Sequence, residues 1–139
     1  MRSAIIDEEL THSVIGAFFE VYNTLGFGFL ENLYVMALER ELLARGHRVH
    51  REFAVVVNYK GQELGHQRLD IVVDDRLIIE TKSTDKLHPQ ALRQLYNYLK
   101  ATNLQVGLLL HFSPSGAKFY RQIHTSDRKQ SVASAQSVR

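Results

Sequence analysis

The sequence contains no cysteine among its 139 residues, which excludes disulfide bonds and thiolate metal sites. It also lacks any stretch near the ~20 consecutive apolar residues that a membrane-spanning helix needs. The N-terminus turns acidic at Asp7 before a long apolar run develops, which argues against a secretory signal peptide. We therefore expect a cytoplasmic protein without a membrane partner.

The sequence also has no strong excess of one charge. It contains 17 Lys and Arg and 15 Asp and Glu, which gives a net charge of +2. A protein that holds DNA by charge alone is more basic, so nucleic acid is allowed as a partner but not indicated. Three arginines and two histidines cluster at Arg45, His47, Arg48, His50 and Arg51. They form either a phosphate-contact patch or, more simply, a solvated helix end and strand start.

What is present is the composition of an ordinary globular domain. Hydrophobic residues make up 45% of the chain, and its length is enough to bury a core within one domain. The last residues are rich in Ser, Gln and Arg and poor in apolar side chains, which is typical of disorder. We expect one domain over residues 1–124 and a disordered polar tail over residues 125–139.

The hydrophobic period changes along the chain from that of helices to that of strands. Two helices, three strands, a helix and two strands are expected over residues 7–25, 30–45, 53–59, 63–73, 77–81, 89–100, 104–112 and 117–123. Consecutive strands form antiparallel hairpins, whereas the later β-α-β passage gives one parallel, right-handed crossover. The order α-α-β-β-β-α-β-β therefore predicts an α/β domain with a mixed central sheet flanked by helices.

Charged residues interrupt two otherwise apolar strands. Asp70 lies in Arg-Leu-Asp-Ile-Val-Val, and Glu80 and Lys82 lie in Leu-Ile-Ile-Glu-Thr-Lys. Burying such groups costs several kcal/mol unless they are paired or bound to a metal. Glu80 and Lys82 share one face because they are two apart on a strand.

The connection between these strands decides whether Asp70 lies beside Glu80. A two-residue turn at Asp74 and Asp75 would place the two acids on opposite faces, whereas a turn that includes Arg76 pairs them directly. With the three-residue turn, every second residue of the two strands lies on a second, almost entirely apolar face. These residues are Leu69, Ile71, Val73, Leu77, Ile79 and Thr81. The hydrophobic pattern therefore selects the three-residue turn and places two carboxylates side by side.

Two adjacent carboxylates repel each other unless a proton or a cation lies between them. A hard divalent ion such as Mg²⁺ takes one or two carboxylates, often a backbone carbonyl, and waters, and Asp70, Glu80 and the Thr81 carbonyl provide such ligands. Lys82 could position a water or offset charge on a phosphate. The set predicts a phosphodiesterase-type site using Mg²⁺, with Mn²⁺ able to substitute. A salt-bridged cluster on an exposed strand face is the alternative.

Two further groups could face the same site. Gln94 and Tyr98 lie four apart on the third helix and could reach a catalytic water or a phosphate, although an ordinary amphipathic helix explains them too. Glu31 complements the dipole in the first turn of the second helix and shares a face with Tyr34. Seven histidines show no HExxH-like pairing, so zinc is not expected.

An ordered series of short motifs between Ile6 and Ile123 resembles the GxxExxY protein family, which is grouped with the PD-(D/E)XK nuclease superfamily. The motifs are Gly28-x-x-Glu31-x-x-Tyr34, Tyr59-Lys60-Gly61, Arg68-Leu69-Asp70, Ile79-Glu80-Thr81-Lys82, Gln94-Leu95-Tyr96-Asn97-Tyr98-Leu99 and Gly107-Leu108-Leu109-Leu110. The resemblance implies a restriction-endonuclease-like α-β-β-β-α-β core and a metal-dependent nuclease, with DNA as the expected substrate.

The resemblance also implies roles for individual residues. Asp70 and Glu80 match the metal-binding acids, Lys82 the motif lysine, and Glu31 an additional metal or water contact. Gln94 and Tyr98 match the QxxxY pattern of the lambda-exonuclease and RecB-like branch, where these residues support the site and contact nucleic acid. The candidate catalytic residues are Asp70, Glu80, Lys82, Glu31 and Gln94; the metal ligands are Asp70, Glu80, Thr81 and Glu31; the nucleic-acid contacts are Tyr98, Tyr34 and Arg93.

Two positions depart from the family pattern, and neither belongs to the acid and lysine set. His111-Phe112-Ser113 stands where Asn-Phe-Gly is frequent, and Phe27 stands where proline is frequent. The alternative function is a catalytically silent nuclease-fold module that binds nucleic acid or a protein partner. Apolar surfaces containing Phe18, Phe19, Phe27 and Phe29 could in addition pair two chains as a homodimer.

Overall fold

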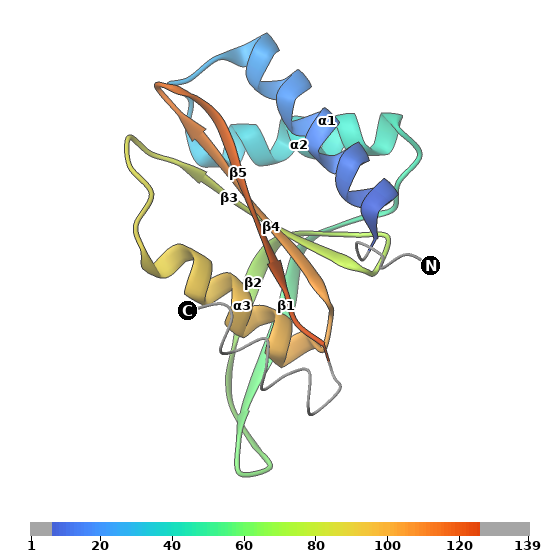
Figure 1. Ribbon diagram of the computed structural model, residues 1–139. Helices are drawn as coiled ribbons and strands as arrows, with labels where there is room; N and C mark the ends of the chain where they lie inside the picture. Colours follow the sequence, from blue (N-terminus) through green and yellow to red (C-terminus); the bar gives the residue numbers. More distant parts are fainter. Residues whose placement is uncertain (1–6, 126–139) are drawn as a thin grey trace.

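The computed structural model describes residues 7–125, and residues 1–6 and 126–139 lie outside this description (Figure 1). The elements are α1 (Glu8–Leu25), α2 (Glu31–Ala44), β1 (Val49–Tyr59), β2 (Gln62–Val73), β3 (Leu77–Ser83), α3 (Gln90–Thr102), β4 (Val106–Ser113) and β5 (Gly116–Ile123). Their order is the expected one. The polar tail expected over residues 125–139 lies outside the described residues except for Thr125, so the domain boundary stays a prediction.

The strands form one mixed sheet in the order β1-β2-β3-β4-β5. Among the strands of residues 7–125, only β3 and β4 pair in parallel, and α3 connects them, as a parallel crossover requires. Figure 1 shows α1 and α2 on one face of the sheet and α3 on the other. The expected α/β class, with a mixed sheet flanked by helices, is therefore confirmed.

Each face of the sheet carries its own hydrophobic core. Phe18 of α1, Leu38 of α2 and Phe112 of β4 belong to the first, and Leu95 and Leu99 of α3 belong to the second. β4 contributes to both and is buried along its whole length, as its apolar run predicted. A stable core on both faces leaves β2 and β3 with little freedom to shift against each other.

The β1–β2 hairpin is longer than expected and extends beyond the rest of the molecule as an arm (Figure 1). β1 begins at Val49 and not at Phe53 as expected. The hydrophobic pattern did not reveal this earlier start, because Arg51 and Glu52 interrupt the apolar alternation that marks a strand. Glu52 has a φ of 54°, which bends the strand at this point.

The expected division of faces is correct for residues 71–79 and wrong for Leu69. Ile71 and Ile79 pack beneath α1 and α2, but Leu69 packs with Ile78 against α3. The alternation changes face at Asp70, which lies across from the bend in β1 between the pairs Arg51↔Ile71 and Phe53↔Leu69. A regular period of two cannot reveal such a change.

A chain of hydrogen bonds fixes the turn between β2 and β3 to α1. Asp74 accepts from the backbone N–H of Arg48 at 2.8 Å, and its other oxygen lies 2.8 Å from His47 Nδ1. His47 Nε2 lies 2.7 Å from Ser13 Oγ. Ser13, His47 and Asp74 have the order of a hydrolase triad, but the middle of a helix provides no free N–H groups for an oxyanion hole. This series of hydrogen bonds, called the Ser13–His47–Asp74 clamp below, therefore has a structural role.

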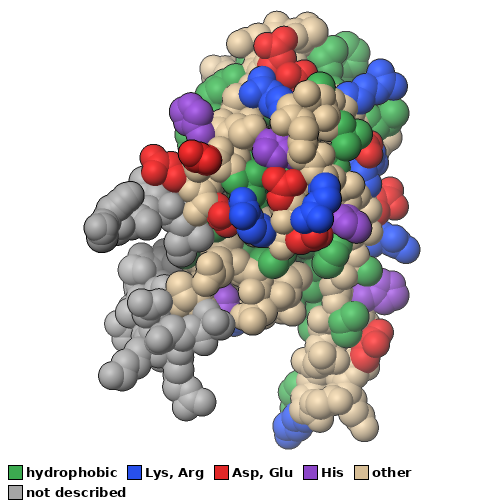
Figure 2. All heavy atoms as spheres, turned by 90° about the vertical axis from the view of Figure 1, so that its right-hand side faces the viewer, with side chains coloured by type: hydrophobic (Ala, Val, Ile, Leu, Met, Phe, Trp, Pro, Cys, Tyr) green, Lys and Arg blue, Asp and Glu red, His purple; other side chains and the backbone are tan. Residues whose placement is uncertain are grey.

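The arginines near the start of β1 are neutralised by acids. Arg45 pairs with Glu41 at 3.2 Å, Arg48 with Asp75 at 2.9 Å and Arg51 with Glu39 at 3.0 Å. Figure 2 shows acidic and basic side chains interspersed on one face of the molecule. The simpler interpretation of this cluster, a solvated face, is therefore favoured over a phosphate-contact patch.

The four phenylalanines proposed as a pairing surface do not lie together on the outside. Phe18 is fully buried in the core, so the expectation is wrong for this residue. Phe19, Phe27 and Phe29 are 38%, 41% and 46% exposed, so pairing of two chains through them stays a prediction. Within residues 7–125, no helix combines the length and hydropathy needed to cross a membrane.

Candidate active site

The candidate site lies where β2 and β3 separate. Their backbone pairing runs from Val73↔Leu77 to Ile71↔Ile79 and ends there. This register confirms the predicted three-residue turn and makes Asp70 and Glu80 the next opposed pair. The two carboxylates therefore stand at the opening between the strands.

Hydrogen bonds between side chains and backbone replace the sheet pairing at this opening. Thr81 donates from its backbone N–H and from its hydroxyl to Asp70 Oδ2, each at 2.8 Å. Asp70 N–H in turn donates to Glu80 Oε2 at 3.1 Å. Across the gap, Ser83 N–H donates to Glu31 Oε1 at 3.3 Å, which brings the first turn of α2 to the same place.

Each of the three carboxylates thus has one oxygen fixed by a backbone N–H group. The second oxygen of Asp70, Glu80 and Glu31 accepts no hydrogen bond from any residue that the structure describes. Fixed carboxylates with one free oxygen each are suited to bind a cation, because their geometry is already set before the cation arrives.

The three acids also share one electrostatic environment. Burial, and next the charge of Asp70, raises the pKa of Glu80 to about 8, although Lys82 and the N–H of Asp70 oppose this. Burial raises the pKa of Glu31 as well, against the opposing charge of Lys82. Protonation of a buried acid beside a second acid is the response expected of a pair that lacks a neutralising cation.

The donor set fits a hard divalent cation. Asp70 and Glu80 offer carboxylate oxygens, and the Thr81 carbonyl faces the same gap, because the N–H and C=O of one strand residue point to the same side. Within residues 7–125, no three His, Asp or Glu side chains converge into a ready-made metal cage. Mg²⁺ does not need one, since it usually keeps several waters and takes only one or two carboxylates.

Lys82 lies half-buried on the face of β3 that carries Glu80. It forms no ion pair within 4.0 Å with an acid in the described part of the chain, so the alternative of a salt-bridged cluster is not supported. Its charge nevertheless lowers the pKa of both Glu80 and Glu31. The ammonium group is therefore close to the acids and available to a ligand.

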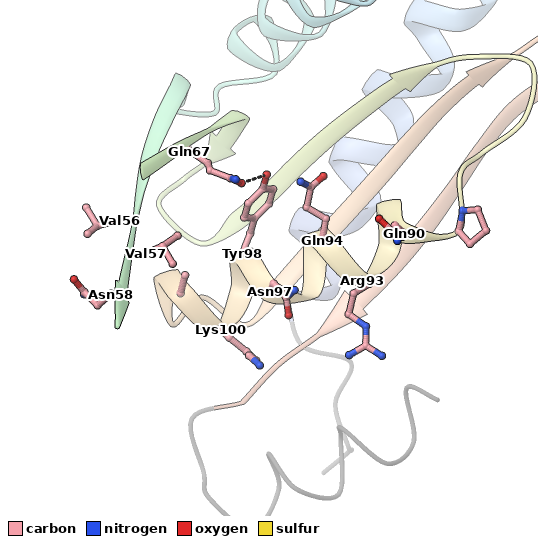
Figure 3. Close-up of a pocket in the computed structure, with 12 residues that line it drawn as sticks. Val56, Val57, Asn58, Gln67, Gln90, Arg93, Gln94, Asn97, Tyr98 and Lys100 are labelled. Atoms are coloured by element: carbon pink, nitrogen blue, oxygen red, sulfur yellow. Dashed lines mark hydrogen bonds between the residues drawn. The ribbon is translucent and has the colours of Figure 1, made fainter. Parts of the chain in front are cut away.

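Gln94 and Tyr98 project from α3 on the same side (Figure 3). The Tyr98 hydroxyl donates to Gln67 Oε1 of β2 at 2.6 Å, and only 8% of the residue is exposed. Burial, then the charges of Glu80 and Asp70, raises the pKa of Tyr98, which places it within their field. Tyr98 thus forms the wall beside the acids, and its expected contact with nucleic acid stays a prediction.

Gln94 is exposed and links two cavities. It lines a pocket that also contains Lys82 and a larger groove beside Tyr98. Arg93 is exposed on an adjoining side of α3 and points away from Gln94 and Tyr98 (Figure 3). The structure therefore brings Gln94 to the pocket of Lys82, and Arg93 does not line that pocket.

Tyr34 does not face the site, which corrects the expectation that it contacts nucleic acid. It is fully buried, and its ring stacks on Phe112 with 3.9 Å between the centroids. Its hydroxyl donates to the Gly26 carbonyl and accepts from Phe29 N–H. Positions three apart on a helix differ in direction by about one sixth of a turn, which is enough to separate a surface carboxylate from a core ring.

The Gly28, Glu31 and Tyr34 pattern acquires a physical explanation from these contacts. Gly28 has a φ of 124°, a conformation that L side chains rarely adopt. Tyr34 fastens the loop that contains this glycine, and the loop leads directly to Glu31. The pattern therefore combines a bend, a site carboxylate and the residue that holds the bend in place.

The sequence did not point to Ser83, Gln67 or His111 as parts of the site. Ser83 N–H holds Glu31, and its hydroxyl donates to the Phe29 carbonyl at 3.1 Å. His111 is buried, with Nε2 2.8 Å from the Thr84 carbonyl oxygen after β3. Ser83 and His111 act through backbone contacts and Gln67 through the Tyr98 hydroxyl. All of these contacts depend on tertiary structure, and only the position of Ser83 next to Lys82 could have drawn attention to it.

A family model described as the PD-(D/E)XK nuclease superfamily matches residues 8–123. The chain belongs to the PD-(D/E)XK nuclease superfamily. Nucleases of this superfamily typically use divalent metals and act on nucleic acid, which agrees with the donor set at Asp70 and Glu80. No curated protein has a matching sequence.

Two solved structures are similar to this chain. The crystal structure of SSO0001 has a TM-score of 0.53 and 20% identity, and the match covers 94% of this chain and 65% of that chain. This chain thus spans somewhat less than two thirds of SSO0001. The alkaline exonuclease LHK-Exo from Laribacter hongkongensis has a TM-score of 0.45 and 14% identity, covering 99% of this chain and 79% of that chain. At 20% identity, the similarity to SSO0001 concerns the fold alone.

Proposed function

We propose that this protein is a Mg²⁺-dependent nuclease that hydrolyses phosphodiester bonds in DNA, with Mn²⁺ able to substitute. One observation carries the proposal. Three carboxylates, Glu31, Asp70 and Glu80, lie near Lys82, and within the described residues each has one oxygen held by a backbone N–H group and one that accepts no hydrogen bond.

Asp70, Glu80 and the Thr81 carbonyl would hold the cation, and Glu31 would contact it or its water. A bound divalent cation lowers the pKa of water and polarises a phosphate oxygen. The rigid hydrogen bonds of Asp70 and Glu80 keep these ligands in place, so little reorganisation is needed when substrate binds.

The other site residues act on the substrate and the attacking water. The Lys82 ammonium group offsets the negative charge that develops on the phosphate. Gln94, which is exposed and lines the pocket that contains Lys82, orients the water. Tyr98, held by Gln67, excludes bulk water from the side of α3 and keeps the local dielectric constant low.

Membership of the GxxExxY family and of the lambda-exonuclease and RecB-like branch is part of the same proposal. The bend at Gly28, the site carboxylate Glu31 and the fastening residue Tyr34 support the first assignment. Gln94 and Tyr98, on one side of α3 beside the acids, support the second. The nuclease domain would then span residues 1–124.

Cleavage assays with active-site variants test the proposal. Wild-type protein should cleave labelled DNA with Mg²⁺ or Mn²⁺ and not with EDTA, while Asp70→Asn and Lys82→Ala should each lower the rate by at least ~100-fold. Asp75→Asn, at an exposed position of the turn, is the matched control and should keep the activity. Cleavage of RNA of the same sequence, compared with cleavage of the DNA, measures the preference for ribose or deoxyribose.

Cleavage that survives both substitutions would show that another site is responsible. If the wild-type protein cleaves no substrate but binds nucleic acid equally well with and without EDTA, the silent binding module replaces the enzyme. Circular dichroism of each variant establishes that a lost activity does not come from a lost fold.

A further inference from the structure

A broad groove lies between α3 and the β1–β2 arm, with a volume of about 1090 Å³ (Figure 3). Val57 and Gln67 line it from the arm, and α3 contributes a longer wall. Gln90 and Gln94 line both this groove and the pocket that contains Lys82, so the groove leads to the candidate active site.

The helix wall is suited to a polyanion. Gln90, Arg93, Asn97 and Lys100 follow one another at spacings of three and four residues, so they form one exposed stripe along α3. The helix contains no acidic residue, and none is among the described residues that line the groove. Amide and cationic groups in a row are typical donors to successive phosphates.

The two cations of this stripe differ from the arginines near the start of β1. Arg45, Arg48 and Arg51 are each paired with an acid. Arg93 and Lys100 form no ion pair with any acid in the described part of the chain. Their charge therefore remains available to a ligand.

The arm wall has a different chemistry. Val57 points toward α3 and is 37% exposed, and Gln67 of the arm also turns toward the helix (Figure 3). Neither residue is charged. The groove thus has a cationic, amide-rich side and an uncharged, partly apolar side, an asymmetry that matches one nucleic-acid strand. A duplex that filled the groove would bring phosphates to both walls, and the described residues of the arm that line the groove offer no cation to them.

We propose that this groove binds a single strand of nucleic acid next to the active site, with its phosphates along α3 and its bases against the arm. The proposal rests on the proposed nuclease function, which supplies the reason for a strand to lie there. Pockets for one drug-sized ligand have volumes of ~300–1,000 Å³. A groove of about 1090 Å³ therefore has room for a short stretch of nucleotides and not for a duplex turn.

Binding of a labelled oligothymidylate, followed by fluorescence anisotropy in EDTA, tests the groove separately from catalysis. The Asp70→Asn protein serves as the background, so no substrate is consumed. Arg93→Ala and Lys100→Ala should each weaken binding by roughly three- to tenfold at low salt and reduce the salt slope by about 0.7. Lys100→Arg, which keeps the charge, should retain the affinity.

Two control positions separate the groove from general surface charge. Arg40→Ala removes an exposed arginine of α2, on the opposite face of the sheet, and should change the affinity by less than about twofold. Val57→Asp places a carboxylate in the groove and should weaken binding by roughly tenfold, whereas Leu64→Asp, at an exposed position of the arm outside the groove, should not.

Equal affinity of the Arg93→Ala and Lys100→Ala proteins for the oligothymidylate would overturn the proposal, and so would tighter binding to a duplex of equal length. If these variants lose binding but the wild-type protein cleaves nothing, the groove stands and the nuclease function falls. If the wild-type protein cleaves and the variants bind normally, the reverse conclusion holds.

Discussion

Asp70 and Glu80 are held by reciprocal hydrogen bonds to the backbone, and this explains why two acids can stand side by side in the folded protein. Each N–H group stabilises the carboxylate opposite to it, at 2.8 Å and 3.1 Å. The compensation is incomplete, because the pKa of Glu80 is still raised to about 8. The site therefore carries an electrostatic cost that a cation would remove.

That cost predicts how stability depends on pH in the absence of metal. Because burial and Asp70 raise the pKa of Glu80 from 4.5 to about 8, the folded state keeps a proton that the unfolded state has lost. Stability in EDTA should therefore fall as the pH rises from 5 to 8. Glu80→Gln keeps the hydrogen-bond acceptor and removes the charge, so it should raise the free energy of unfolding at pH 8 by roughly 1–3 kcal/mol.

Urea denaturation of the wild-type and Glu80→Gln proteins at both pH values measures this difference. The gain should shrink toward zero at pH 5, where the wild-type carboxyl is protonated in the folded state. A gain that is equal at both pH values would mean that Glu80 is not the titrating group. Glu63→Gln, at an exposed acid of β2 on the arm, provides the control.

At the residue scale, the sequence identified the acids and the lysine because such groups are rare within apolar strands. It placed Tyr34 wrongly, since a tyrosine three residues from Glu31 can be a surface contact or a core ring, and only packing decides. It could not reveal Ser83 or Gln67, whose roles depend on contacts across elements far apart in the chain.

The loop between α1 and α2 acts as an element that delivers Glu31 to the site. Its conformation depends on the buried Tyr34 hydroxyl, which contacts both Gly26 and Phe29. Ser83 provides a second attachment through the Phe29 carbonyl. Loop and strand are thus joined on either side of Glu31.

Tyr34→Phe tests this attachment, because it keeps the ring against Phe112 and removes only the hydroxyl. The Gly26 carbonyl and the Phe29 N–H would lose their partner, at a cost of about 1–3 kcal/mol in the free energy of unfolding. Thermal or urea unfolding measures the change. Tyr59→Phe, at an exposed position of the arm, should change stability by less than about 0.5 kcal/mol. Equal effects of the two substitutions would contradict the attachment.

At the element scale, the sequence predicted the turn between β2 and β3 because a slip of one residue would have exposed a whole apolar face. The Ser13–His47–Asp74 clamp that reinforces this turn left no recognisable pattern, since its members come from three separate segments. The early start of β1 and the change of face at Asp70 were missed for one reason. Both depend on a local bend at Glu52 that interrupts the regular alternation.

At the scale of the whole molecule, the net charge of +2 conceals an uneven distribution. Acids neutralise the arginines at the start of β1, while Arg93 and Lys100 remain unpaired along α3 within the described residues. Composition could not foresee this, because pairing is decided by which elements meet in the fold. The groove beside α3, with Arg93 and Lys100 on its helix wall, leads to the pocket of Lys82. The acids lie near Lys82, at the gap between β2 and β3.

Calorimetric titration with Mn²⁺ tests the central claim, a divalent cation site at Asp70 and Glu80, most directly. The wild-type protein should bind the ion with release of a proton, and the affinity should rise by up to ~10-fold per pH unit below the Glu80 pKa of about 8. Asp70→Asn and Glu80→Gln should abolish binding, while Glu63→Gln, at an exposed acid of the arm, should leave it unchanged. Unaltered Mn²⁺ binding in a protein that carries both site substitutions would contradict the account.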